Sequence, residues 1–400
     1  MSDPRKRRSA KWSAKACDIC GESRKLESLG ARSYLAPTRR YLFEFELRDV
    51  LCLRCGFVFA GDIPDEPFLF DYYQDSFTSL SEYRPLVPDF NVESRLGPIR
   101  QHLSAGSTIL EVGANTGSFC TVLERAGYEA HGIDPVSDES TSNVGRLGSQ
   151  NTNNRRYDAS ASYYVAEHVP FGRLWLEDVK KSLKDGGLLF IEVPHFESHP
   201  AESLNKEHLL HFTPRSLTQL LNGCGFQVLE ENKSPASVYF GFSTTARLTS
   251  AGAAERIEAP KLDQTRLTYK RGIELIGRQA EQYRQKAASL LTAIKRLSRR
   301  EKVKVLFWAA NEHASGIANE LRSLVEAPFE IIDSSTQKIG CSHDGFNSPV
   351  QAPRIATKDE SHRLFVLCSP VWNVEIRKQI EAMGLENITI IDGLNAADIE

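Results

Sequence analysis

Residues 107–135 constrain the fold more than any other stretch of this 400-residue chain; they read STILEVGANTGSFCTVLERAGYEAHGIDP. A short apolar strand runs into a turn containing Gly113 and Gly117, a segment with helical spacing follows, and a second strand ends at Asp134. Two strands joined in this way by a helix pair in parallel through a right-handed crossover. The segment therefore predicts an α/β fold built on a parallel sheet.

The turn in this segment is suited to a ligand. Glycines at 113 and 117 let the backbone pass close to a bound molecule at the N-terminus of the helix. Asp134 follows the turn by about 20 residues, where a carboxylate can bind both hydroxyls of a ribose. These positions predict a nucleoside-containing ligand at the carboxyl edge of the sheet.

The turn has the pattern Glu-x-Gly-x-x-x-Gly, which resembles motif I of class I S-adenosylmethionine-dependent methyltransferases. Three later stretches resemble the same family in order: residues 163–169 the fourth strand, 179–194 a helix, Gly-Gly turn and fifth strand, and 216–231 the last helix and sixth strand. The resemblance implies a Rossmann-like core with S-adenosylmethionine as cofactor. The cofactor-binding residues that it implies are Glu111, Gly113, Ala114, Asn115, Gly117, Asp134, Glu167 and His168.

One segment departs from this family. Only 23 residues separate Asp134 from Asp158, and they are polar and rich in Asn and Ser. The family usually has a helix and a third strand here, and the end of that strand lines the adenine pocket. Either the adenine is held differently, or cofactor binding is weakened or lost. A methyltransferase fold that has lost its activity is the alternative, because a fold alone never guarantees a function.

Four of the eight cysteines form two matched Cys-x-x-Cys pairs, Cys17 with Cys20 and Cys52 with Cys55, each followed by a glycine. Two such pairs aim four sulfurs at one point and predict a Zn²⁺ site. All four ligands come from the protein, so the zinc is expected to be structural. The alternative is two unrelated pairs, one of them a redox dithiol.

A second group of titratable residues lies in SLNKEHLLHFTP, residues 203–214. A cysteine quartet, a methyltransferase core and then this loop together resemble the sugar C-methyltransferases, which act on nucleotide-activated keto-deoxysugars. The resemblance implies that Glu207 and His208 are catalytic, with the histidine as base. The family has a tyrosine two residues before this glutamate, where the chain has Asn205.

The resemblance also implies a tyrosine from residues 70–85 at the site. Tyr72, Tyr73 and Tyr83 are the candidates, and Tyr73 is preferred. Packing between two domains is the alternative role for any one of these rings.

The chemistry of C-methylation explains these residue types. A carbon next to a carbonyl must lose a proton before it attacks a methyl group, and an imidazole near neutral pKa can take that proton. Alternatively, His208 and His211 are solvated residues at a helix start, with Thr213 as N-cap and Pro214 at the first helical position. Two further alternatives are O-methylation of a saccharide and a non-catalytic protein that binds nucleotide sugars.

The rest of the chain predicts further units. Residues 262–300 form a long helix with a heptad seam, which packs on the chain's own core or pairs with a second copy as a homodimer. Strand–turn–helix patterns after it resemble the C-terminal Rossmann-like domain of the same family, with only Gly316 in the turn. The predicted division is a disordered basic tail (1–14), zinc module (15–65), methyltransferase core with connecting segment (66–245), helical linker (246–300) and Rossmann-like domain (301–400).

Composition and charge limit the classes of partner that this chain is expected to bind. A net charge of −3 gives no general attraction to nucleic acid, although the basic N-terminus leaves a nucleic-acid arm as an alternative to a free tail. No apolar run approaches the roughly 20 residues of a membrane-spanning helix, and the N-terminus lacks the apolar stretch of a secretory signal. The sequence therefore predicts a cytoplasmic protein that binds a small-molecule substrate.

Overall fold

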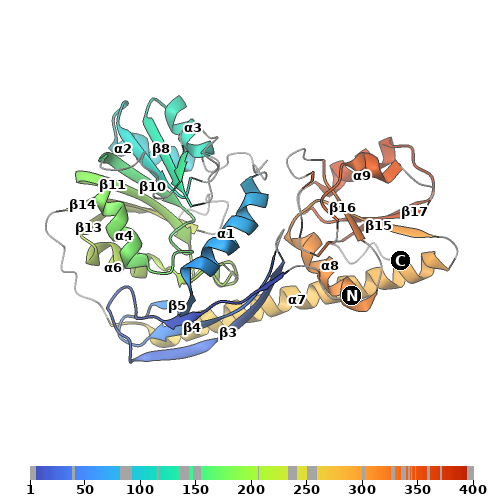
Figure 1. Cartoon of the computed structure of the whole chain (residues 1–400), viewed down its shortest axis with the longest axis horizontal. Helices are drawn as coiled ribbons and strands as arrows, with labels where there is room; N and C mark the ends of the chain where they lie inside the picture. The colour runs from blue at the N-terminus through green and yellow to red at the C-terminus, as the bar shows by residue number, and fades with distance from the viewer. Residues whose placement is uncertain are drawn as a thin grey trace.

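The computed structural model describes residues 6–37, 41–81, 92–114, 117–135, 144–146, 155–205, 207–232, 241–249, 259–299, 302–325, 329–334, 339–340, 343, 345–346, 348–357, 361–369 and 372–393. One lobe holds a large sheet above a long hairpin, and a second, smaller lobe lies at the other end of the molecule (Figure 1). A single long helix, α7, runs beneath both lobes. Within the described residues, no helix is long and apolar enough to cross a membrane.

The central sheet of the larger lobe has seven strands in the order β13-β14-β11-β10-β7-β8-β9. Only β14 runs against its neighbours β11 and β13. The first five strands along the chain follow the doubly wound order 3-2-1-4-5, in which the strand order reverses between β7 and β10. Ligands of such sheets bind beyond the carboxyl ends of the strands at this reversal. The strands are β7 (Thr108–Val112), β8 (Glu129–Asp134), β9 (Val144–Arg146), β10 (Tyr157–Tyr163), β11 (Leu183–Pro194), β13 (Phe226–Asn232) and β14 (Gly241–Leu248).

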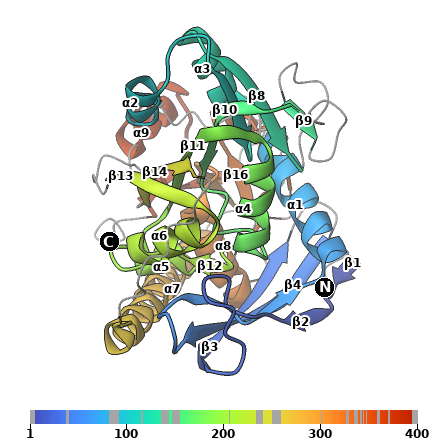
Figure 2. The ribbon, with the colours of Figure 1, turned by 90° about the vertical axis from the view of Figure 1, so that its left-hand side faces the viewer.

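Helices cover this sheet and connect it to the rest of the lobe (Figure 2). They are α1 (Glu66–Ser81), α2 (Val92–His102), α3 (Ser118–Arg125), α4 (Gly172–Lys181), α5 (Pro200–Ser203) and α6 (Pro214–Gly223). The start of α6 agrees with its sequence signals: Thr213 caps the helix by accepting the backbone N–H of Ser216, and Pro214 is at the first helical position.

Two strands differ from the sequence prediction. The sequence assigns residues 163–169 to the fourth strand, but β10 ends at Tyr163, so Glu167 and His168 lie in the loop beyond it. The polar segment after Asp134 contains a short third strand, β9, paired in parallel with β8. Residues 136–143 and 147–154 lie outside the described part of the chain.

The N-terminal residues form an antiparallel hairpin of two 12-residue strands, β3 (Leu26–Pro37) and β4 (Tyr41–Cys52). Alternating apolar residues in YLFEFEL favour β4 because successive side chains of a strand point to opposite faces. Four shorter strands accompany the hairpin: β1 (Lys6–Arg8), β2 (Trp12–Ala14), β5 (Val58–Ala60) and β6 (Asp62–Pro64). Strand β5 also pairs with β12 (Leu210–His211), which belongs to the predicted catalytic loop, residues 203–214.

The prediction of a disordered tail over residues 1–14 is wrong for the residues described. Strand β1 pairs in parallel with β4, and β2 pairs with β6. Backbone hydrogen bonds to strands that come later in the chain hold this segment, so its basic composition alone did not reveal its structure.

Helix α7 (Leu262–Ser298) packs on both lobes. Its first half contributes the buried Tyr269 to a cluster with Leu51 of β4 and with Leu204, which follows α5. Its second half contributes Ala287, Leu290 and Ile294 to the core of the second lobe. At these positions the heptad seam packs on the chain's own core. Ile273 of the seam remains 39% exposed, and the homodimer stays a prediction.

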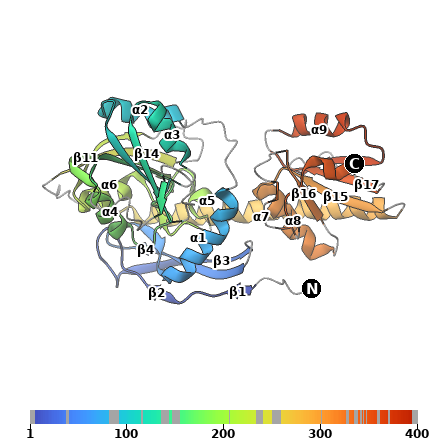
Figure 3. The same cartoon turned by 45° about the horizontal axis from the view of Figure 1, so that its top comes forward.

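The second lobe is a four-stranded parallel sheet in the order β16-β15-β17-β18. Helices α7 and α8 lie on one side of it and α9 on the other (Figure 3). Its elements are β15 (Val303–Trp308), α8 (Glu312–Leu324), β16 (Phe329–Ile332), a 3₁₀ helix (Pro353–Thr357), β17 (His362–Leu367), α9 (Asn373–Ala382) and β18 (Ile388–Asp392). The Rossmann-like assignment of this lobe stays a prediction.

Candidate active site and cysteine cluster

The glycine turn directly follows β7, which pairs with β10 in the central sheet. Gly113 has a φ of 80°, and a Cβ at this position would lie 2.2 Å from Cγ2 of Val165, in the segment beyond β10. Gly117 also has a positive φ, 71°, at the start of α3. Both conformations favour glycine, and the contact with Val165 leaves no room for a side chain at 113.

Two carboxylates flank this turn. Glu111 of β7 is buried, and burial raises its pKa to about 7 although the Cys120 thiol donates a hydrogen bond to its Oε2 atom (3.0 Å). Asp134, the last residue of β8, is buried as well. Ala114 is buried beside the turn, while Asn115 lies outside the described residues. The structure thus gathers Glu111, Gly113, Ala114, Gly117 and Asp134 at one edge of the sheet.

A second cluster of titratable side chains includes His208 of the predicted catalytic loop. One side-chain ligand atom from each of Glu167, His168 and His208 lies within 4.8 Å of the others. The two histidine rings stand edge to face, with centroids 4.8 Å apart, and Nε2 of His168 is 3.9 Å from Oε1 of Glu167. Glu167 is 1% exposed and His208 is 7% exposed.

Backbone carbonyls define the tautomers of the two histidines. The Nδ1 atom of His168 lies 3.1 Å from the carbonyl oxygen of Glu207, and that of His208 lies 3.2 Å from the carbonyl oxygen of Ser203. A carbonyl only accepts, so each Nδ1 carries a proton and the neutral ring keeps its lone pair on Nε2. Burial lowers the pKa of both rings, and for His208 the nearby His168, His211 and Arg32 lower it further.

Glu167 is an unusual carboxyl group. Both of its side-chain oxygens are buried and have no hydrogen-bond partner among the described residues. Burial raises its pKa to about 8, and Glu192 contributes in the same direction. Its backbone carbonyl accepts hydrogen bonds from the N–H groups of Leu209 and Leu210 (2.7 and 3.1 Å), which ties the Glu167 loop to the catalytic loop.

Two neighbouring tyrosines reach the cluster from α1. The Tyr72 hydroxyl donates to Oε1 of Glu207 (2.8 Å), and the Tyr73 ring stands edge-on to His168 with centroids 6.1 Å apart. Burial, with Glu207 and Glu167 nearby, raises the pKa of Tyr73 well above its ordinary value. Tyr83 lies outside the described residues. The Asn205 side chain is exposed, and its backbone oxygen accepts the N–H of His208 (3.1 Å).

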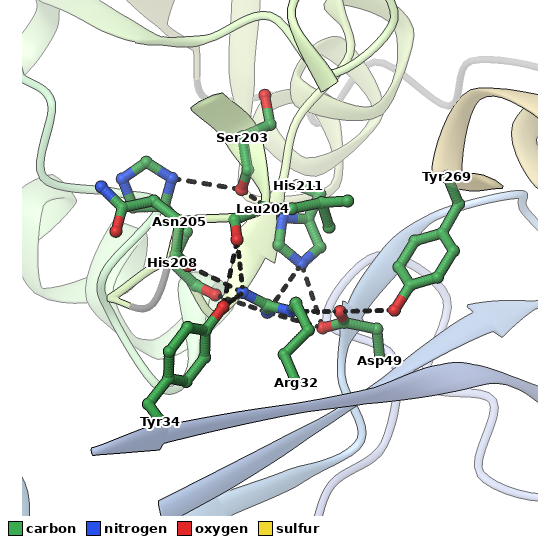
Figure 4. A network of polar contacts seen from close by, with 9 residues as sticks. All are labelled: Arg32, Tyr34, Asp49, Ser203, Leu204, Asn205, His208, His211 and Tyr269. Carbon is green, nitrogen blue, oxygen red and sulfur yellow. Dashed lines mark hydrogen bonds and ion pairs between the residues drawn. The ribbon is translucent and has the colours of Figure 1, made fainter. Parts of the chain in front are cut away.

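A buried polar network lies beneath the catalytic loop (Figure 4). Arg32 of β3 and Asp49 of β4 form an ion pair with both side chains almost fully buried, and His211 and Tyr269 also contact the Asp49 carboxylate. Sequence patterns did not indicate Arg32 or Asp49. They precede the catalytic loop by more than 150 residues, and no local motif marks either position.

The four predicted metal ligands meet in space. The sulfur atoms of Cys17, Cys20, Cys52 and Cys55 all lie within 4.8 Å of one another, and the closest pairs are 3.5 Å apart. Zn–S bonds of about 2.3 Å in a tetrahedron separate the sulfurs by about 3.8 Å, so the donor set and spacing fit Zn²⁺. The glycines after each pair have φ of 71° and 81°, and each donates its N–H to the carbonyl of the first cysteine (2.8 Å).

Comparison with known proteins finds similarity in part of the larger lobe. Residues 87–231 match the family model described as a methyltransferase domain. The chain is 25% identical over 209 residues to the C-methyltransferase NovU of Streptomyces niveus. That match covers 46% of this chain and 48% of NovU, so it spans about half the length of the relative.

Solved structures include similar chains. A 1,6-didemethyltoxoflavin-N1-methyltransferase of Burkholderia thailandensis is 17% identical, with a TM-score of 0.39, over 48% of this chain and 96% of its own. A magnesium protoporphyrin IX methyltransferase of Synechocystis is 12% identical, with a TM-score of 0.35, over 47% of this chain and 98% of its own. Residues 87–231 therefore match a methyltransferase domain, and the chain is similar in sequence to a C-methyltransferase.

Proposed function

We propose that this chain transfers a methyl group from S-adenosylmethionine to a carbon atom of a nucleotide-activated keto-deoxysugar, with His208 as the general base. The observation that carries the proposal is the buried His208 ring, whose Nδ1–H faces the Ser203 carbonyl and whose lone pair is therefore on Nε2. The similarity to NovU supports transfer to carbon.

The residues at the glycine turn fit the proposed cofactor. Gly113 supplies the positive-φ turn after β7, and we assign the buried Asp134 carboxylate at the end of β8 to the ribose hydroxyls. Glu167 and His168 lie beside the proposed base, and we assign them to the methionine end of the cofactor. When bound, S-adenosylmethionine supplies an electrophilic methyl group on a sulfonium.

The chain's own groups then account for the proton and the negative charge. Nε2 of His208 takes the proton from the carbon beside the sugar carbonyl, and the C–H electron pair becomes the enolate. Tyr72 orients the Glu207 carboxylate, which is left to hydrogen-bond the substrate. Tyr73 and the Asn205 amide are the donors that we assign to the enolate oxygen. The four cysteines hold a structural Zn²⁺ in this proposal.

Two measurements test the cofactor and the reaction. Isothermal titration calorimetry with S-adenosylmethionine is expected to give saturable binding, and no binding at millimolar cofactor would contradict the proposal and favour a non-catalytic sugar-binding protein. Exchange of solvent deuterium into a nucleotide-linked keto-sugar is then followed by mass spectrometry. We expect exchange with the native protein and with His199→Gln, a histidine outside the cluster, but none with His208→Ala. Methyl transfer without exchange would indicate O-methylation.

A metal-dependent enzyme is the second candidate, because Glu167, His168 and His208 form a two-histidine, one-carboxylate donor set of the kind that binds transition metals. A metal ion on Nε2 of His208 would occupy the lone pair that the proposed base needs. Added Zn²⁺ or Co²⁺ therefore inhibits if His208 is the base, and activates if the cluster is a metal centre. Glu167→Gln is expected to weaken either effect, because it removes the charged ligand.

A further inference from the structure

We infer that Arg32, held by Asp49, is a positioning residue for the His208 imidazole, so that the N-terminal hairpin forms part of the catalytic apparatus. The inference rests on the proposed role of His208 as base. It extends that role to a strand pair that carries no residue of the predicted site.

Arg32 is fixed from below by Asp49. Its Nε atom donates to Oδ2 (2.5 Å) and one terminal nitrogen donates to Oδ1 (2.8 Å). The two bonds form a bidentate pair between an arginine residue that is 6% exposed and a fully buried aspartate. Such planar, two-bond geometry fixes the plane of the guanidinium as well as its position. Tyr269 of α7 donates a further hydrogen bond to Oδ2 (3.1 Å), which holds the carboxylate itself.

The two terminal nitrogens of the same guanidinium also bind the catalytic loop. Its NH1 group donates to the carbonyl oxygens of Leu204 (2.8 Å) and Asn205 (2.7 Å), and its NH2 group lies 3.2 Å from the carbonyl oxygen of His208. Figure 4 shows these bonds converging on one side chain. Three carbonyls of a short stretch are thus oriented by one cation, and the stretch includes the carbonyl of the base.

A second path leads from the same carboxylate to the base. Oδ1 of Asp49 lies 3.2 Å from Nε2 of His211, and Nδ1 of His211 lies 2.8 Å from the Ser203 carbonyl. That carbonyl is the one that Nδ1–H of His208 faces at 3.2 Å. Asp49 therefore acts on the loop by two paths: through Arg32 on three of its carbonyls, and through His211 on the Ser203 carbonyl, which faces Nδ1 of the base.

These contacts constrain the base in a way that packing alone does not. Apolar neighbours can bury the ring in either tautomer, whereas a carbonyl oriented toward Nδ1 selects the one with its lone pair on Nε2. A lysine at position 32 would keep the charge but has donors at only one point, so it cannot hold a carboxylate and three carbonyls together. A displacement of about 1 Å at a reacting group can cost about 10²-fold in rate.

The test compares Arg32→Lys with a matched control, Arg266 of α7, whose ion-pair partner lies on the same hairpin. Arg266 makes a bidentate pair with Glu27 of β3 (2.8 and 2.6 Å) and is partly exposed, but among the described residues it makes no contact with the catalytic loop. Arg266→Lys thus changes the same kind of ion pair. With ¹⁵N-labelled histidine, the tautomer and titration of His208 are read by NMR in both variants, and His208→Gln assigns the signal.

We expect Arg32→Lys to lower kcat by about 10²-fold while cofactor binding stays within about twofold of the native protein. The His208 signal is expected to show mixed tautomers, and its pKa to rise toward the ordinary value as the loop loosens and water enters. Arg32→Ala is expected to behave in the same way and to recover part of its activity with added guanidinium. Arg266→Lys is expected to change none of these quantities.

A native-like His208 tautomer and titration in Arg32→Lys and Arg32→Ala would overturn the inference, as would a loss of rate that guanidinium does not restore. The NMR measurement needs no turnover, so it separates this inference from the proposed reaction. If His208 responds to Arg32 but no sugar is methylated, the positioning role stands and the proposed substrate fails.

Discussion

At the scale of single residues, burial determines what the cluster around His208 can do. Two neutral imidazoles and a carboxyl group that lacks hydrogen-bond partners among the described residues share a space in which charge is poorly solvated. Burial therefore favours the neutral form of all three groups: it lowers the pKa of the two histidines and raises the pKa of Glu167. A base and a hydrogen-bond donor can therefore coexist near neutral pH.

Glu167 should make the folded protein less stable as pH rises. Its pKa is raised to about 8 in the folded state, so between about pH 4.3 and pH 8 the folded chain binds more protons than the unfolded chain. The free energy of unfolding should fall by up to about 1.4 kcal/mol per pH unit in this range from this group alone. Urea unfolding at pH 5.5 and pH 8 should show a smaller loss in Glu167→Gln than in the native protein; equal losses would contradict the prediction.

His208 should set the acidic limb of the pH–rate profile. Its folded pKa is lowered well below the ordinary value of about 6.5, so it stays a competent base at pH values where a solvated histidine is protonated. The apparent pKa in kcat/KM is expected below 6.5. Profiles of the native protein and of His199→Gln should coincide, and a limb above 6.5 in both would exclude His208 as this base.

At the scale of elements, each functional side chain is placed by the end of a strand or by a turn. The glycine turn follows β7, Asp134 ends β8, the Glu167 loop follows β10, and the catalytic loop lies between α5 and α6. Carboxyl ends of parallel strands meet at one edge, which is why segments far apart in the chain converge there. Strand β12 adds a second constraint, because it pairs the catalytic loop with β5 of the N-terminal module.

Glycine substitutions in two elements should have opposite effects. Gly113→Ala places a methyl group 2.2 Å from Val165 in a positive-φ turn, so it should destabilise the protein and weaken cofactor binding. Gly277 lies inside α7, where a Cβ would meet no described atom within 4 Å, and Gly277→Ala should stabilise by about 0.5–1 kcal/mol. Thermal unfolding and calorimetry measure both; equal cofactor affinity in Gly113→Ala and the native protein would place the cofactor elsewhere.

At the scale of the whole molecule, the cysteine module and the methyltransferase domain share one core. Cys17, Cys52 and Cys55 belong to the same buried cluster as residues of β11 and α6. Arg173 of α4 adds hydrogen bonds to the carbonyls of Asp18 and Ile19 (2.8 Å each), inside the first Cys-x-x-Cys turn. Loss of the proposed zinc should therefore destabilise the whole larger lobe and not only the hairpin.

Metal removal is expected to lower the stability of the catalytic lobe. The native protein should contain about one zinc per chain, and Cys20→Ser should lose it and unfold at a lower temperature. Cys368→Ser, in the core of the second lobe, should keep the zinc. Elemental analysis and thermal unfolding give the two readouts, and an unchanged zinc content in Cys20→Ser would contradict a four-cysteine site.

Short-range patterns in the chain were enough to predict its local chemistry. The positive-φ glycine turn, each of the two cysteine pairs that converge in space and the Thr213 cap depend on residues close together in the chain. The roles assigned to the Glu–His pairs stay predictions. Which groups act together depends instead on tertiary contacts. Strand pairing between β12 and β5 and burial of Asp49 bring Arg32 under the catalytic loop, and the strand partners of residues 6–14 come from distant segments. Hydrogen bonds between residues more than 30 positions apart leave no periodicity in the chain, so only the folded structure reveals them.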